Sequence, residues 1–236
     1  MADGIYVSMA GATARERQLD SIADNLANAQ TPGFKASRTV FATVLAGESG
    51  LRAFPAVAGT GSDLRPGATA HSGNPLDVLP EDGAFLGVRT SNGTLAYTRD
   101  GRLSVDAQGT LRAAGQPVLT AAGATVALPP NAKLEIGSHG QLMVDGKELG
   151  RLALFHLEGG ADRSGPSLVT PSASNQGHAT PVEGRVATGA VELGNRTALD
   201  AMVDMVSAQR HFEASMQALD AYRKMGDRSN ELGKVR

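Results

Sequence analysis

Three carboxylates lie close together in the first half of the chain, at Asp77, Glu81 and Asp82. Such a group could supply the general acid and the general base of a hydrolase, because both roles need a carboxyl group beside the reacting bond. Carboxylates in loops and turns are, however, far more often simply hydrated. We favour this second interpretation, and a hydrolase remains a distant alternative.

Other patterns of catalytic or metal-binding residues are missing. The chain has no cysteine, which excludes disulfides, thiolate metal ligands and a cysteine nucleophile. Asp145-Gly146 resembles one corner of a calcium loop, but the carboxylates expected before it are absent. The sequence contains no nucleophile elbow, P-loop or dinucleotide-binding glycine run. We therefore expect no enzyme activity, no catalytic residue, no cofactor and no metal.

Composition limits the partners of the chain. Its 236 residues carry a net charge of −2, and aromatic residues make up only 4% with no Trp, which argues against a nucleic-acid partner. No apolar run approaches the roughly 20 residues that span a membrane. The first residues also lack the basic start of a secretory leader. We expect neither membrane insertion nor a cleaved signal peptide.

The elements that must position any functional residue begin with a helix over residues 4–28. Its apolar side chains recur at steps of three and four, as in one stripe of a helix; they are Ile5, Met9, Ala12, Leu19, Ala23 and Leu26. Thr31-Pro32-Gly33 follows the helix and predicts a type II turn in which Gly33 has a positive φ. Phe34 comes next and can act as an apolar anchor.

A second helix is predicted over residues 197–225. The same spacing places six residues on a stripe that is interrupted by the polar Gln209: Ala198, Met202, Met205, Phe212, Met216 and Leu219. Two long amphipathic helices at opposite ends of a chain most simply bury their stripes against each other, as an antiparallel-type coiled pair. They could also bury them against other subunits.

Between the helices, turn signals with Gly recur every few residues and separate short alternating runs, which is typical of an all-β domain. Asn92-Gly93 is one such hairpin signal. The predicted fold is thus α+β. Residues 1–35 and 194–236 form the helical domain, 36–69 an extended connector, and 70–193 the β-rich domain. Within the latter, residues 159–182 look like a long surface loop because they are rich in Gly, Ser, Thr, Pro and Asn.

Several motifs resemble those of the rod and hook proteins of the bacterial flagellum. The segment 23–35, ADNLANAQTPGFK, resembles the family's NLAN-x-x-TPGF-K signature. The runs NPLDV at 74–78, DGAFLGV at 82–88 and YTRDG at 97–101 resemble its strand block, and QRHFE at 209–213 resembles its last-helix motif. The short distance from Phe34 to Asn74 is similar to that in proximal rod members.

This resemblance implies a structural subunit of the rod, the drive shaft of the flagellum. It implies helical polymerisation in the periplasm after export by the flagellum's own type III apparatus, without a cleaved leader. Copies of the chain, other rod proteins and the export apparatus would be its partners. The terminal helices would form an inner tube and the β domain an outer layer. A distal rod protein, or a secreted β-rich binding or adhesion module, is the alternative.

Assembly contacts are expected on both helical stripes, at the turn after the first helix and in the last-helix motif. The residues concerned are Met9, Leu19, Ala23, Asn25, Leu26, Asn28, Thr31, Pro32, Gly33, Phe34, Met202, Met205, Gln209, Arg210, Phe212, Glu213, Met216 and Leu219.

Overall fold

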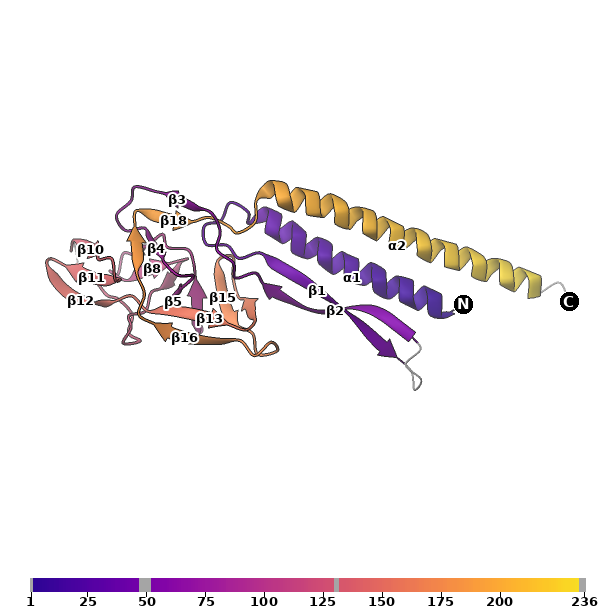
Figure 1. The fold of residues 1–236 in the computed structure, drawn as a ribbon, viewed down its shortest axis with the longest axis horizontal. Helices are drawn as coiled ribbons and strands as arrows, with labels where there is room; N and C mark the ends of the chain where they lie inside the picture. Colours follow the sequence, from indigo (N-terminus) through magenta and orange to yellow (C-terminus); the bar gives the residue numbers. More distant parts are fainter. Residues whose placement is uncertain (1, 47–51, 130–131, 234–236) are drawn as a thin grey trace. The chain divides into compact units, whose positions relative to one another are not determined.

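The computed structural model describes residues 2–46, 52–129 and 132–233. They fold into two compact units. The first, which we call the helical unit, comprises Met1–Ala27, Arg38–Thr60 and Ala198–Arg236. The second, the β unit, comprises Asn28–Ser37 and Gly61–Thr197. Figure 1 colours the chain from its N-terminus to its C-terminus, so that the segments of each unit can be found by their colour.

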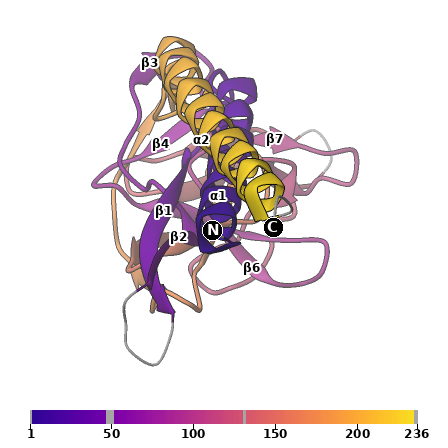
Figure 2. The same ribbon diagram turned by 90° about the vertical axis from the view of Figure 1, so that its right-hand side faces the viewer.

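In the residues that the structure describes, the helical unit contains two helices and one two-stranded ribbon. Helix α1 (Ala2–Ala27) lies beside helix α2 (Ala198–Gly233), and strands β1 (Ser37–Ala46) and β2 (Arg52–Ser62) pair into the ribbon (Figure 2). The Arg15 guanidinium of α1 sits 4.8 Å from the centre of the Phe41 ring of β1, so the ribbon is held to α1 by a cation–π contact. Within the described residues, neither helix is long and apolar enough to cross a membrane.

The predicted coiled pair of terminal helices is wrong, although the coarser α+β class holds. α1 has 26 residues and α2 has 36, and the ribbon shares their unit. A coiled pair needs a continuous apolar seam, but Met202 and Met216, expected on that seam, are 52% and 37% exposed. The buried side of α2 carries instead Ala201, Ala208 and Leu219. The predicted stripe is therefore not continuous: Leu219 faces inward, but the other two buried positions are alanines, and Met202 and Met216 face outward.

Residues 36–69, expected as an extended connector, contain the whole β1–β2 ribbon. The apolar residues at 40, 41, 44 and 45 fit a helix as well as a strand, and the Gly, Ala, Pro and Ser that follow suggest a connector. The proposed domain boundaries stay a prediction, which the fragments described in the Discussion would test.

The described part of the β unit is built from one large sheet and four small ones. The large sheet is antiparallel, in the order β14-β15-β6-β5-β13-β16; its strands are β5 (Phe85–Arg89), β6 (Leu95–Thr98), β13 (Leu154–Glu158), β14 (Ala161–Arg163), β15 (Leu168–Pro171) and β16 (His178–Val182). Two small sheets have three strands: β7 (Ser104–Val105), β8 (Leu111–Ala113) and β9 (Gln116–Pro117), and β10 (Leu134–Ile136), β11 (Gln141–Val144) and β12 (Lys147–Arg151). Two are pairs: β4 (Val78–Pro80) with β17 (Val186–Thr188), and β3 (Thr69–His71) with β18 (Ala190–Glu192).

Two local predictions have opposite outcomes. The Asn92-Gly93 hairpin is confirmed, because Gly93 has φ +78° and joins β5 to β6. The surface loop at 159–182 is wrong, because this segment contributes β14, β15 and β16 to the large sheet. The polar composition of the segment gave no indication of strands. β15 pairs with β6, β16 with β13, and β14 with β15.

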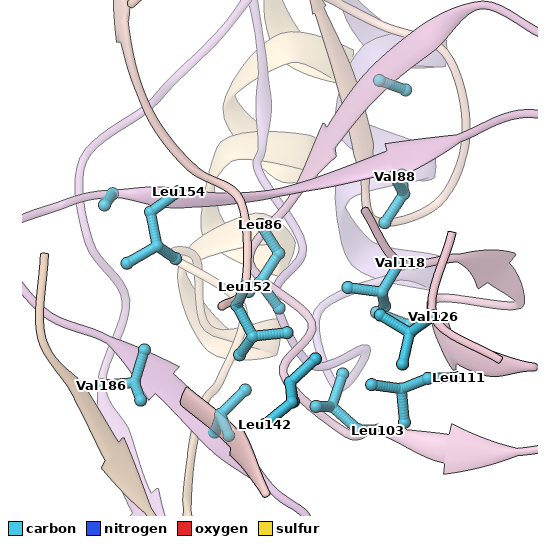
Figure 3. Packing of buried hydrophobic residues seen from close by; sticks show 14 of the residues in the cluster. Leu86, Val88, Leu103, Leu111, Val118, Val126, Leu142, Leu152, Leu154 and Val186 are labelled. Atoms are coloured by element: carbon cyan, nitrogen blue, oxygen red, sulfur yellow. The ribbon is translucent and has the colours of Figure 1, made fainter. Parts of the chain in front are cut away.

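The core of the β unit lies on both faces of the large sheet. On one face, Leu86 and Val88 of β5 point toward Leu111 and Leu142 from other strands (Figure 3). On the other face, Phe85 of the same strand packs in a smaller cluster with Tyr97, Ala161 and Val169. The alternation along β5 follows from the two-residue period of a strand. Both faces of the large sheet are therefore covered by packed side chains.

Candidate functional site

The turn after α1 has the predicted geometry. The Phe34 amide donates a hydrogen bond to the Thr31 carbonyl at 3.2 Å, and Gly33 has φ +67°, as expected for the third position of a type II turn. The Gly33 amide donates to the backbone carbonyl of Glu192 at 2.8 Å. The turn is therefore fixed to the end of β18, far away in the sequence.

Phe34 is the apolar anchor of this segment, as predicted. Its side chain is fully buried, and the Arg163 guanidinium stands 5.4 Å from the centre of its ring. The Phe34 carbonyl accepts a hydrogen bond from the Asn195 amide at 3.3 Å. The Asn195 side chain continues this contact, because its Oδ1 accepts from the Ala36 amide at 2.8 Å and its Nδ2 donates to the Asp63 carbonyl at 2.7 Å.

Lys35, Arg99 and Glu192 form a buried charge cluster beside this turn, which we call the junction triad. Their side chains are 2%, 4% and 0% exposed. Lys35 Nζ donates to Glu192 Oε1 at 2.7 Å. Arg99 approaches the other carboxylate oxygen with two nitrogens, Nε at 2.7 Å and Nη2. Both bonds go to the same oxygen, and because donor and acceptor are charged they are stronger than bonds between neutral groups.

Backbone groups complete the coordination of the junction triad. Lys35 Nζ also donates to the Arg65 carbonyl at 2.7 Å, and the Gly67 amide donates to Glu192 Oε1 at 3.1 Å. Arg99 Nη1 donates to the carbonyls of Pro80, at 2.9 Å, and Ala84. Every side-chain nitrogen and oxygen of the triad is thus engaged by the protein itself. Such an arrangement suits a structural joint better than a substrate site.

The triad shifts the ionisation of its own members. Burial alone raises the pKa of the Glu192 carboxyl, but the hydrogen bonds and charges of Arg99 and Lys35 outweigh burial, and the pKa lies below its ordinary value. Burial, with the nearby Arg99 charge, lowers the pKa of Lys35 despite its bond to Glu192. Because the cluster holds two cations and one anion, the carboxylate is its more strongly stabilised charge.

The expected assembly residues fall into two environments. Those in the turn and helix ends that are buried or half-buried are Leu19, Asn25, Leu26, Asn28, Thr31, Pro32, Gly33, Phe34, Met205, Phe212 and Leu219. Those exposed on the helices are Met9, Ala23, Met202, Gln209, Arg210, Glu213 and Met216. The structure therefore brings together the turn residues, whereas the helical residues lie on more than one face. Their role in assembly stays a prediction.

One face of α2 carries a cluster of exposed apolar side chains, which we call the α2 patch: Leu199, Met202, Val203 and Val206. Their exposed fractions are 71%, 52%, 62% and 50%. Spacings of three and four residues place them on one side of the helix. Met202, Val203 and Val206 also line a shallow groove with Ser207, Arg210 and His211. Exposed apolar groups in such a group mark interaction surfaces.

The acidic cluster shows no catalytic arrangement. Asp77 is buried and accepts a hydrogen bond from Asn74 Nδ2 at 2.9 Å, whereas Glu81 is only partly buried and lies 3.6 Å from Arg185 Nε. Asp82 is exposed in a turn with φ +52°. Asp82 is therefore a hydrated carboxylate, as expected. Asp77 is not, because it is buried and its hydrogen bond stabilises a loop. Over the described residues, no group of three or more potential ligands could hold a metal ion.

Three protein-family models match the chain in order. A flagella basal body rod protein model covers residues 5–35, a flagellar hook protein FlgE/F/G D1 domain model covers 82–144, and a flagellar basal body rod FlgEFG protein C-terminal model covers 187–232. FlgF of Escherichia coli (strain K12), a flagellar basal-body rod protein, is 32% identical over 98% of both chains.

The chain belongs to the flagellar basal-body rod protein family.

Other members are similar over much of their length. FlgF of Mesorhizobium japonicum is 33% identical over 90% of both chains. The basal-body rod protein FlgG of Buchnera aphidicola is 26% identical over 98% of this chain and all of its own. This rod protein is accordingly a structural axial subunit of the flagellar rod.

Each family model contributes one member of the junction triad. Lys35 closes the first matched segment, Arg99 lies in the second and Glu192 in the third. Sequence reasoning quoted Lys35 and Arg99 within motifs but gave them no role. The available signal was the position of Lys35 between two apolar residues, Phe34 and Ala36. Both are buried in the structure, so a charge between them needs a partner. Nothing local in the sequence identifies that partner as Glu192.

Proposed function

We propose that this rod protein assembles by helical polymerisation, with its α2 patch buried by a neighbouring subunit. Repeated head-to-tail contacts between different surfaces generate open helical filaments rather than closed oligomers. Such a filament needs a surface that stays uncovered until the neighbour arrives. The exposure of Leu199, Met202, Val203 and Val206 in the single chain is the observation that carries this proposal.

The other expected assembly residues enter the proposal according to their exposure. Met9 and Met216 are exposed, and in this proposal they contact neighbours directly. Phe34 and Leu219, which are buried, would act by holding the surfaces that make contact. Copies of the chain and other rod proteins are the proposed partners, and the role is structural rather than catalytic.

The position of the chain in the rod and its route there are also proposals. Its similarity to several FlgF proteins over 90% or more of their length supports a proximal position over a distal one. We infer export by the flagellar type III apparatus to the periplasmic part of the basal body. The lack of cysteine supports this route, because a disulfide would hinder passage of an unfolded chain.

The test replaces one residue of the α2 patch with a charge. Val203→Asp is introduced into a motile strain whose own copy of this gene has been deleted, and Gln217→Asp serves as the matched control. Gln217 is exposed on the same helix and is already polar. We expect Val203→Asp to fold normally, as judged by its thermal unfolding, but to be missing from purified basal bodies. Gln217→Asp should support swimming. Normal rods with Val203→Asp would refute the proposed contact.

A further inference from the structure

Two stretches of chain run together at the junction triad. Residues 28–37 follow α1 and residues 192–197 precede α2, and both lie within the β unit. Three backbone amides join them: Gly33 to the Glu192 carbonyl, Asn195 to the Phe34 carbonyl and Ala36 to Asn195 Oδ1. The Lys35–Glu192 ion pair adds a side-chain bond across the same two stretches.

The main core has hydrogen bonds that do not involve these stretches. The Gly87 amide donates to the Ala153 carbonyl at 2.9 Å, and the Val118 amide donates to the Leu111 carbonyl at 2.9 Å. Leu86, Val88, Leu111 and Leu142 pack among themselves in that core (Figure 3). The junction touches the core through Arg99, which donates to the Ala84 carbonyl and lies 5.7 Å from the centre of the Phe85 ring. The core hydrogen bonds and packing contacts named above nevertheless do not involve residues 28–37 or 192–197. Parts of a protein with separate contacts can open separately.

We propose that the junction triad is a latch that closes both terminal stretches onto the β unit through the single carboxylate of Glu192. Glu192 forms an ion pair with each of the two cations, through Oε1 to Lys35 and through Oε2 to Arg99. Glu192 also accepts a hydrogen bond from the Gly67 amide, so the same carboxylate holds the loop before β3. Opening this latch releases residues 28–37 and 192–197 while the main core stays folded.

The charges of the triad predict how strongly each variant opens the junction. Glu192→Gln leaves two buried cations without the carboxylate that both of them contact, which is strongly destabilising. Lys35→Met removes the odd cation and leaves a balanced Arg99–Glu192 pair, so it should be tolerated. The double variant Lys35→Met with Glu192→Gln should be less open than Glu192→Gln alone, because one of the two repelling cations is gone. A latch made only of shape complementarity would not give this order.

Amide hydrogen exchange of the full chain in solution tests the proposal. We expect Glu192→Gln to speed exchange at Gly33, Ala36, Gly67 and Leu193 by on the order of 100-fold. Exchange at Gly87 and Val118 should keep its wild-type rate. Lys35→Met and the control Glu183→Gln, which changes an exposed carboxylate of the same unit, should alter junction exchange by less than about tenfold.

Several outcomes would overturn the latch. Equal loss of protection at the junction and the core, or failure of Glu192→Gln to fold, would make the triad an ordinary part of the core. Unchanged exchange at the junction in Glu192→Gln would mean that the triad does not stabilise the junction. A double variant more open than Glu192→Gln would contradict the charge argument. Because all readings come from the single chain in solution, they do not depend on the proposed polymerisation.

Discussion

Gly33 packs directly against the backbone of Asp100. A Cβ atom added to Gly33 would stand 2.1 Å from the Asp100 nitrogen and 2.4 Å from the Arg99 carbonyl carbon. No flexible side chain lies between them, so the clash could be relieved only by moving the backbone. Glycine is therefore required here by close approach as well as by its positive φ of +67°.

We predict that Gly33→Ala destabilises the chain more than Gly93→Ala. Gly93 also has a positive φ, +78°, but a Cβ there would meet nothing within 4 Å. Its variant should lose about 1–2 kcal/mol from backbone strain, whereas Gly33→Ala should lose about 2–5 kcal/mol because overpacking is added. Urea unfolding measures both. Equal losses would show that the contact with Asp100 is unimportant.

Acid should weaken the junction through Glu192. The pKa of Glu192 is lowered in the folded chain, so its contribution to stability is present above its unfolded pKa of about 4.3 and is lost as the pH falls through the lower folded pKa. We expect the free energy of unfolding to decrease with pH below about 4.3, and to decrease less steeply in Glu192→Gln. Thermal unfolding across this pH range provides the measurement.

Asp106 offers the matched control for the acid experiment. Its pKa is also lowered, mainly by the hydrogen bond from Arg112 Nε at 2.6 Å, but the ion pair lies at the surface. Solvent screens such pairs, so Asp106→Asn should change the pH dependence less than Glu192→Gln does. A larger effect of Asp106→Asn would contradict our view that the buried triad dominates acid sensitivity.

Leu219 and Met202 were predicted on one stripe, and we now expect them to behave differently. Leu219 is only 5% exposed, so Leu219→Asp would bury a charge without a partner and should cost several kcal/mol of stability. Met202 is 52% exposed, so Met202→Asp should leave the thermal unfolding of the single chain nearly unchanged. If both variants unfolded at the same temperature, the buried face of α2 would be misassigned.

Fragments test the proposed domain boundaries. We expect residues 69–193 to unfold cooperatively, because the main core lies within them. The fragment 28–197 should be more stable by about 3 kcal/mol, since it retains the fully buried Phe34. Phe34→Ala in the longer fragment should remove most of that difference in urea unfolding. Equal stability of the two fragments would place the turn outside the folded β unit.

Local sequence signals were sufficient where backbone geometry depends on adjacent residues. The two helices were expected at 4–28 and 197–225 and are found at Ala2–Ala27 and Ala198–Gly233. Gly33 and Gly93 take the positive φ values that their turns require. Phe34 is buried, as expected of the anchor after the turn. In each case the cause lies within a few residues of the effect.

Tertiary structure decided everything that depends on partners far apart in the chain. The strands β15 and β16 form in a polar segment because β6 and β13 supply their hydrogen bonds, and β14 then pairs with β15. Ala201 and Ala208, rather than Met202, face inward on α2 because the surroundings of the helix select its buried side. Glu192 meets Lys35 across 157 positions and Arg99 across 93. Burial makes this ion pairing necessary, and only the folded chain determines which charges are brought close enough to provide it.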